Sequence, residues 1–146
     1  GPNPTDRAKS GVKRHILTDG RGVPLSAEIT AANVHDKRAA IPTVDAIVVR
    51  APRGPRRPTN LCLDKGYDFD DIDREIRARG IRPHIRRRGE KPRSCRRGRA
   101  RRWVVERTNA WHNRFRALLI RWERKATNYL GLLHLACAMI ALRHTM

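Results

Sequence analysis

A short apolar run that ends in a carboxylate constrains this chain most. Leu61, Cys62 and Leu63 have the length and character of a buried β-strand, and Asp64 follows them directly. A carboxylate that ends a buried strand lies at the edge of a sheet, where its oxygens can bind a metal ion. Because most aspartates at strand ends only form turns, Asp64 alone is a weak signal for such a site.

Two earlier segments predict an antiparallel β-hairpin. Residues 12–18 (VKRHILT) have strand character, and residues 23–31 (VPLSAEITA) alternate apolar residues with polar or small ones, as a half-buried strand does. Residues 19–22 (DGRG) separate them, and Asp and Gly tolerate the positive φ that a tight turn needs. A further short strand is expected over residues 81–85, where Pro83 favours the edge of a sheet.

Four segments have the pattern of helices. We expect them over residues 37–49, 70–79, 103–125 and 129–142. Asp36 is placed to cap the first helix, and the neighbouring His35 is more often a packing or hydrogen-bonding residue than a metal ligand. The second helix has Asp70, Asp71 and Asp73 in its first turn, where the helix dipole favours negative charge. These three acids are therefore expected to be structural.

The helix predicted over residues 103–125 has an apolar stripe and a polar face. The stripe recurs at the helical period through Val104, Trp111, Phe115, Leu118 and Trp122. Glu106 lies roughly 200° round the axis from Val104, at about 100° per residue, and so falls on the polar face. The apolar terminal helix is expected to cover the stripe.

The charge balance predicts a polyanionic partner. The chain has 146 residues and carries 33 Lys and Arg against 14 Asp and Glu, a net charge of +19. Most of the cations are arginines, whose planar fork binds phosphate at two points. Nucleic acid is therefore the expected partner, with an anionic membrane or an acidic protein as the alternative.

The basic charge is densest in residues 86–102 (RRRGEKPRSCRRGRARR). No core can form from such a segment, so it is expected to be a solvated arm or a phosphate-binding loop within the domain. The candidate DNA contacts in and near it are Arg86, Arg87, Arg88, Arg96, Arg97, Arg99, Arg101, Arg102 and Arg114.

Other features narrow the class of protein. Cys62, Cys95 and Cys137 are odd in number and far apart, which supports neither a zinc knuckle nor a disulfide framework. The chain begins with no signal peptide, and His134 interrupts an apolar stretch that is short for a membrane span. We expect one cytoplasmic, nucleoid-associated domain over residues 1–146, without membrane contact. Because no Met begins the chain, we expect it to be a piece of a longer protein.

An aspartate on a strand and a glutamate on a helix are a recurrent pair of metal ligands. Asp64 and Glu106 supply oxygen atoms, which suit Mg²⁺ or Mn²⁺. Two such ions about 3.5–4 Å apart activate a nucleophile and stabilise the leaving oxygen in phosphoryl transfer. The pair is compatible with a metal-dependent phosphoryl-transfer site, but two acids alone are a weak signal for one.

Four blocks of the sequence resemble one known family. They read NPTDRAKSGVKRHILTDGRGVPL, ITAANVHD, LCLDKGYD and RRWVVERTNAWHNRFRALLIRWERK. In this order they resemble DDE transposases of bacterial insertion sequences, of the insertion-sequence-five group, over essentially the whole chain. The resemblance implies an α/β, RNase H-like (ribonuclease H-like) fold, with a mixed sheet flanked by helices. It also implies cutting and joining of DNA strands with divalent metal, Mg²⁺ or Mn²⁺.

The resemblance assigns roles to particular residues. Asp64 matches the family's second catalytic Asp, and Glu106 matches its catalytic Glu. The wider family carries the signature Tyr, two residues, Arg, three residues, Glu, six residues, Lys, to which Arg102 and Glu106 conform. Arg99 stands at the Tyr position and Asn113 at the Lys position, so those two roles are not assigned. Arg114, one residue further on, is a substitute phosphate contact.

The family's first catalytic Asp lies on a strand before the NPTDR-like block, at which this chain begins. Asp6 in the lead-in and Asp19 in the hairpin turn do not replace it. The chain therefore resembles the C-terminal part of a transposase, without the first strand of the sheet. We expect partners beyond DNA to be the product of an upstream reading frame or further copies of the chain.

Three functions are compatible with these features. The first is a transposase segment that is inactive alone, because two carboxylates bind Mg²⁺ poorly. The second is a non-catalytic DNA-binding remnant or regulator of transposition. The third is a basic RNA-binding protein, which few aromatic residues (5%) disfavour. The roles of His35, Lys65 and Tyr67 stay open.

Overall fold

The structure is a computed structural model. It describes residues 1–4, 7, 9–48, 58–87, 89 and 102–145. The first elements are the antiparallel strands β1 (Val12–Thr18) and β2 (Pro24–Ala31), which confirm the predicted hairpin. Asp19 closes their turn, since its Oδ1 accepts hydrogen bonds from the backbone N–H groups of Arg21 (2.8 Å) and Val23 (2.9 Å).

A second, parallel pair of strands follows. Strand β3 (Asn60–Leu63) leads through the 3-10 turn η1 (Lys65–Tyr67) and helix α2 (Asp70–Ala78) to β4 (Arg82–Ile85). These bounds agree with the predicted elements. The described strands form two separate sheets, β1–β2 and β3–β4, rather than one continuous mixed sheet.

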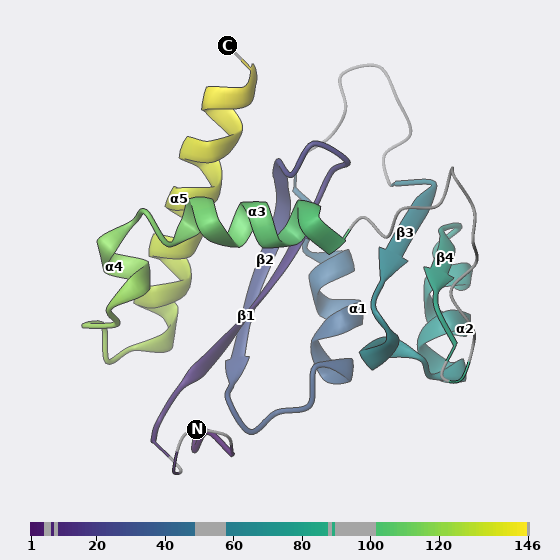
Figure 1. The fold of residues 1–146 in the computed structure, drawn as a ribbon, viewed down its shortest axis with the longest axis horizontal. Coiled ribbons are helices and arrows are strands. Elements are labelled where there is room, and N and C mark those ends of the chain that lie inside the picture. Colours follow the sequence, from purple (N-terminus) through teal and green to yellow (C-terminus); the bar gives the residue numbers. More distant parts are fainter. Residues whose placement is uncertain (5–6, 8, 49–57, 88, 90–101, 146) are drawn as a thin grey trace.

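Helix α1 (Lys37–Asp45) connects the two sheets and shares a core with both. The buried centre of this core comprises Ala40, Val44, Leu61, Ile72, Ile76 and Ile81. Leu17 of β1 and Leu63 of β3 pack against it, so one layer made by α1 and α2 supports strands from both sheets. In Figure 1, β3 runs in the same direction as β2 and opposite to β1.

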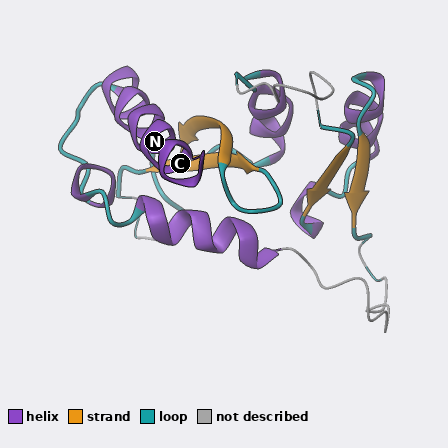
Figure 2. Cartoon of the chain, turned by 90° about the horizontal axis from the view of Figure 1, so that it is seen from above, coloured by secondary structure: helices purple, strands orange, loops and turns teal. Residues whose placement is uncertain are grey.

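The other face of the hairpin is covered by the C-terminal helices. Helices α3 (Arg102–His112), α4 (Arg116–Leu119) and α5 (Ala126–Thr145) follow one another in the chain. Figure 2 shows α3 on one side of the hairpin and α1 on the other. Leu118 and Leu133 bury their side chains with Ala27 of β2 in a second core. None of the described helices, α5 included, is long and apolar enough to cross a membrane.

The prediction of one long helix over residues 103–125 is wrong. Helix α3 ends at His112, and α4 is a separate short helix that begins after an extended Phe115 (φ −87°, ψ 103°). The break lets α4 fold back on α5, where the Tyr129 hydroxyl donates to the Leu118 carbonyl (3.0 Å). Trp122, predicted to lie on the packing stripe, is 78% exposed because the helical period does not continue to it.

The first helix also departs from its prediction at both ends. It ends at Asp45 rather than at residue 49, which lies outside the described residues. Asp36 stands before its first residue but makes no side-chain capping hydrogen bond. The Asp36 carboxylate instead accepts a hydrogen bond from Lys13. His35 takes over the capping role, since the Lys37 backbone N–H donates to its Nδ1 (3.2 Å).

Gly22 is the position where the hairpin turn depends most on the absence of a side chain. Its φ is +88°, and an added Cβ would lie 3.0 Å from Thr108 Oγ1. We expect Gly22→Ala to destabilise the fold by roughly 1–3 kcal/mol, through backbone strain and displacement of α3. Gly131→Ala, in an open helical position of α5, is the matched control and is expected to stabilise by about 0.5–1 kcal/mol. Urea unfolding of both variants checks the two signs.

Candidate active site

Asp64 lies at the carboxyl end of β3, where the strand passes into η1. Its Oδ1 accepts a hydrogen bond from the Gly66 N–H (2.8 Å), so the carboxylate caps η1. The residue is exposed, and within the described part of the chain its Oδ2 has no hydrogen-bond partner. Asp64 is therefore both a turn former and an accessible anionic ligand.

The first turn of α1 holds the segment that follows Asp64. The His35 and Phe69 rings meet edge to face, with their centroids 5.7 Å apart. Lys37 Nζ lies 4.3 Å from the centroid of the Phe69 ring and 2.7 Å from Asp71 Oδ2. The hydrogen bond from Lys37 lowers the pKa of Asp71 below its ordinary value. These contacts fix the Asp64 turn against α1.

Tyr67 is a residue of this region whose role the sequence left open. Burial, together with the nearby carboxylates of Asp36 and Asp64, raises its pKa to about 12. The hydroxyl therefore stays protonated at neutral pH and remains a hydrogen-bond donor near two anions. Lys13 Nζ, 2.9 Å from Asp36 Oδ1, adds a cation from β1 to the same end of the molecule. The signal in the sequence was an aromatic residue three positions after Asp64.

Glu106 lies on the exposed face of α3, as its helical position predicted. The opposite face packs inward through Val104 and Thr108, and the Thr108 hydroxyl donates to the Gly22 carbonyl (2.7 Å). Asp64 and Glu106 thus come from separate elements, and that they share one metal ion stays a prediction. Among the described residues, no three His, Cys, Asp or Glu side chains gather closely enough to hold a metal ion.

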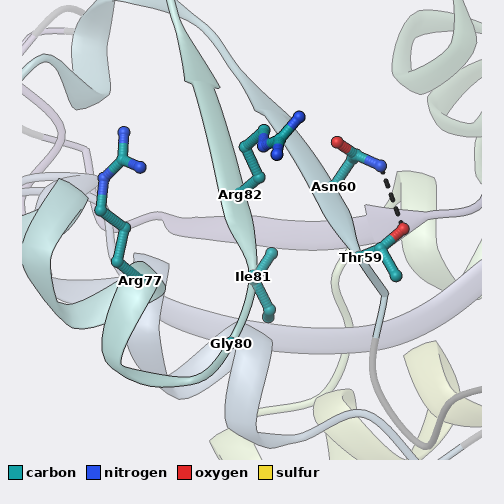
Figure 3. A pocket seen from close by; sticks show the side chains of 6 residues that line it. All are labelled: Thr59, Asn60, Arg77, Gly80, Ile81 and Arg82. Atoms are coloured by element: carbon teal, nitrogen blue, oxygen red, sulfur yellow. Dashed lines mark hydrogen bonds between the residues drawn. The ribbon is translucent and has the colours of Figure 1, made fainter.

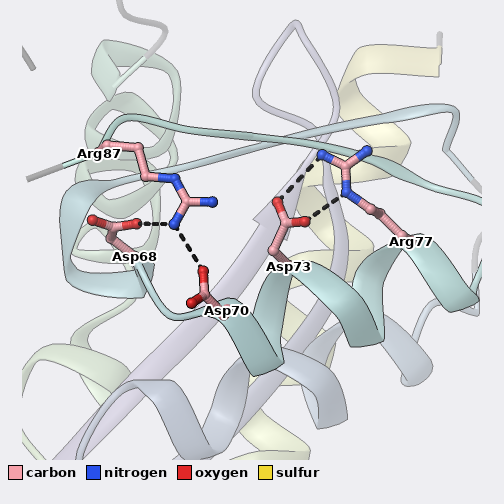
Figure 4. Close-up of polar contacts among 5 residues, drawn as sticks. All are labelled: Asp68, Asp70, Asp73, Arg77 and Arg87. Atoms are coloured by element: carbon pink, nitrogen blue, oxygen red, sulfur yellow. Dashed lines mark hydrogen bonds and ion pairs between the residues drawn. The ribbon is translucent and has the colours of Figure 1, made fainter.

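The acids at the start of α2 pair with cations, Asp71 with Lys37 and the others with arginines, which agrees with the structural role predicted for them. Figure 4 shows Asp73 facing Arg77, with Arg77 Nε 2.5 Å from Asp73 Oδ2. Arg87 NH1 lies 3.3 Å from Asp68 Oδ1 and 2.9 Å from Asp70 Oδ1. The hydrogen bond with Asp70 raises the pKa of Arg87. Arg87, a candidate DNA contact, therefore already holds two carboxylates.

The other candidate DNA contacts are only partly described. Arg86 is half-buried after β4, and Arg114 is exposed in the turn between α3 and α4. The structure describes the backbone of Arg102 but not its side chain. The other five candidates lie outside the described residues: Arg88, Arg96, Arg97, Arg99 and Arg101. Their contact with DNA stays a prediction.

The chain belongs to the family of transposase DDE domains. The family model described as "Transposase DDE domain" matches residues 1–141. The chain is also 46% identical, over 143 residues, to the transposase assigned to insertion sequence element IS402 in Burkholderia cepacia. That match covers 96% of this chain and 67% of the relative. No solved structure matches the chain. The family and the relative confirm the resemblance seen in the sequence, and the function they define is that of a transposase.

Proposed function

We propose that this chain is the part of an RNase H-like transposase domain that supplies the second Asp and the Glu of a metal site. Asp64, presented at the carboxyl end of β3 and held by its turn, is the observation that carries the proposal. In the assembled site Asp64 and Glu106 hold Mg²⁺ or Mn²⁺, which activates the nucleophile and stabilises the leaving oxygen of a DNA phosphodiester.

The ligand chemistry of Asp64 and Glu106 fits such an ion, but two carboxylates are few ligands for it. Carboxylate oxygens are the ligands that Mg²⁺ and Mn²⁺ prefer, and both side chains are exposed. Since no third acid or histidine of the described residues completes a cluster, we propose that a further ligand comes from a segment outside them. The 146-residue chain alone is therefore expected not to cleave DNA.

The arrangement of the strands supports an RNase H-like sheet that lacks one strand. An isolated two-stranded sheet is marginally stable, and parallel strands rarely occur in pairs alone. Here two such pairs rest on the same helical layer. A strand between β1 and β3 would run antiparallel to β1 and parallel to β3, given their directions in Figure 1. It would end beside Asp64, so the same segment can supply the missing ligand.

The charge of the chain supports DNA as the substrate. A net charge of +19 gives affinity through the phosphate backbone, largely without sequence readout. Arg86, Arg114 and the arginines of residues 88–102 are the proposed backbone contacts. A protein that acts on bacterial DNA works in the cytoplasm, in association with the nucleoid. The product of an upstream frame or a further copy of the chain is the proposed partner.

We expect excision of a marked element to depend on Asp64 and Glu106. The assay uses cells that carry the locus encoding this chain together with its flanking DNA, so that any fused or upstream product is present. Asp64→Asn and Glu106→Gln should each lower excision by at least about 100-fold, because metal ligation contributes several kcal/mol to the transition state. Asn keeps an oxygen that can accept the Gly66 hydrogen bond, so the first variant removes charge and not the turn.

Glu75→Gln is the matched control, since Glu75 is an exposed carboxylate on α2 paired with Arg79. It should leave excision unchanged. Iron-catalysed backbone cleavage of the purified chain gives an independent readout, with Fe²⁺ in place of Mg²⁺. Cuts near both residues 64 and 106 support one shared ion, and cuts near only one contradict it.

A non-catalytic DNA-binding remnant or regulator is the second candidate. The small ligand set of the described residues favours it. It predicts no excision above background from the intact locus. It also predicts DNA binding that falls steeply with salt and is unchanged by alanine at Asp64 and Glu106.

A further inference from the structure

The two faces of the β3–β4 sheet differ in character. Leu61, Leu63, Pro83 and Ile85 alternate with the other strand residues, and all four are buried or half-buried. Leu61, Leu63 and Ile85 pack in the core that the helical layer shares. The alternate positions face outward. These four exposed residues are Asn60, Cys62, Arg82 and His84. Parallel sheets are normally covered on both faces, so an exposed polar face on such a pair indicates a partner.

The outward side chains form a line of hydrogen-bond donors. His84 Nε2 lies 2.9 Å from Asn60 Oδ1, and Asn60 Nδ2 donates to Thr59 Oγ1 (3.0 Å). Because the Thr59 oxygen accepts that bond, its hydroxyl proton remains available to an incoming acceptor. Within the part of the chain that the structure describes, no carboxylate pairs with the Arg82 guanidinium. The face therefore offers donors and a cation to an anion.

A notch continues this face at the start of the two strands. It has a volume of about 460 Å³ and is lined by Thr59, Asn60, Arg77, Gly80, Ile81 and Arg82. Figure 3 shows Arg77 and Arg82 on two sides of the bend at Gly80 and Ile81, with Thr59 and Asn60 beyond. Arg77 is bound to Asp73, while no carboxylate lines the notch itself. Its chemistry suits a phosphate group, which arginine binds with two parallel hydrogen bonds.

We propose that the outer face of β3–β4 and this notch form a docking surface for the phosphate backbone of DNA. The proposal rests on the proposed function for the identity of the polyanion. The notch is at the amino end of β3, and Asp64 follows the carboxyl end. A four-residue strand separates them by about 13 Å at a rise of roughly 3.3 Å per residue, or about four base-pair steps of duplex. A duplex held in the notch can therefore pass Asp64.

The first test uses the thiol that lies on this face. Cys62 is exposed between Asn60 and the end of β3. We expect a saturating DNA duplex to slow alkylation of Cys62 by iodoacetamide several-fold, read peptide by peptide in the mass spectrometer. Cys137 is an internal control, because burial raises the pKa of its thiol to about 11 and DNA should not change its slow reaction. An unchanged rate at Cys62 would overturn the proposal.

The second test compares two arginines by the same substitution. Arg82→Gln should weaken binding of a duplex oligonucleotide about tenfold, the effect of one charge-assisted hydrogen bond, and should lower the salt slope by about 0.9. Arg116→Gln, exposed on α4 in the other half of the molecule, removes the same charge and should do neither. Equal effects of the two variants contradict a specific surface. If the unmodified chain binds no duplex even at low salt, the proposed function fails as well.

Discussion

Leu133→Ala should lower the free energy of unfolding by about 2–5 kcal/mol, the usual cost of a cavity at a buried leucine. Leu133 is 0% exposed on α5 and lies in the core that joins this helix to β2 and α4. Ala27 and Leu118 line the same core and are tied to other elements, so they cannot close the cavity fully. Urea unfolding followed by far-ultraviolet circular dichroism measures the change.

Leu135→Ala provides the matched control. It removes the same atoms two residues further along α5, where the side chain is 59% exposed. The change should be within about 0.5 kcal/mol of zero, as for most surface substitutions. If both variants lost the same stability, α5 would be covered on both faces in solution.

Lowering the pH from 7 to 4 should reduce the stability of the fold through His112. Burial, together with the nearby Arg14 guanidinium, lowers the pKa of this residue to about 4. In the unfolded state this histidine has an ordinary pKa near 6.5, so it binds a proton across this range while the folded state does not. The free energy of unfolding therefore decreases as the pH is lowered. The loss approaches about 3 kcal/mol at pH 4, at 1.36 kcal/mol per unit. His15, whose pKa burial also lowers, acts in the same direction.

His112→Gln should flatten this pH dependence. The ring lies between α3 and α5, with Nε2 3.3 Å from Cys137 Sγ, and glutamine replaces it without a group that titrates. His84→Gln, on the exposed face of β4, should leave the slope unchanged. Urea midpoints measured at pH 4, 5, 6 and 7 compare the variants. An unaltered slope in His112→Gln would show that another group is responsible.

Local patterns predicted the strands well. The hairpin followed from alternation and an Asp-Gly turn, and β3 from an apolar run bounded by Asp64. These signals are contained in a few consecutive residues, because strand period and turn chemistry depend little on distant contacts. Helix α2 was equally local, with acids at its start and Gly80 at its end.

Tertiary contacts decided what the patterns missed. The period from Val104 to Trp122 is a valid helical stripe, yet α4 folds back because Phe115, Leu118 and α5 share a core. For the same reason Asp36 binds Lys13 rather than capping α1. The site followed the same division: Asp64 and Glu106 were identified from motifs, whereas the contacts that hold the Asp64 turn involve α1, which no local spacing reveals.

Among the strands that the structure describes, β1 and β3 each leave one edge unpaired, which has a consequence for handling this protein. Open edges invite strands from neighbouring molecules, and positive charge is one of the means by which proteins keep such edges apart. Concentrated salt weakens that repulsion at the same time as it releases bound nucleic acid. The buffers that free the chain from DNA are therefore those in which its copies associate most readily.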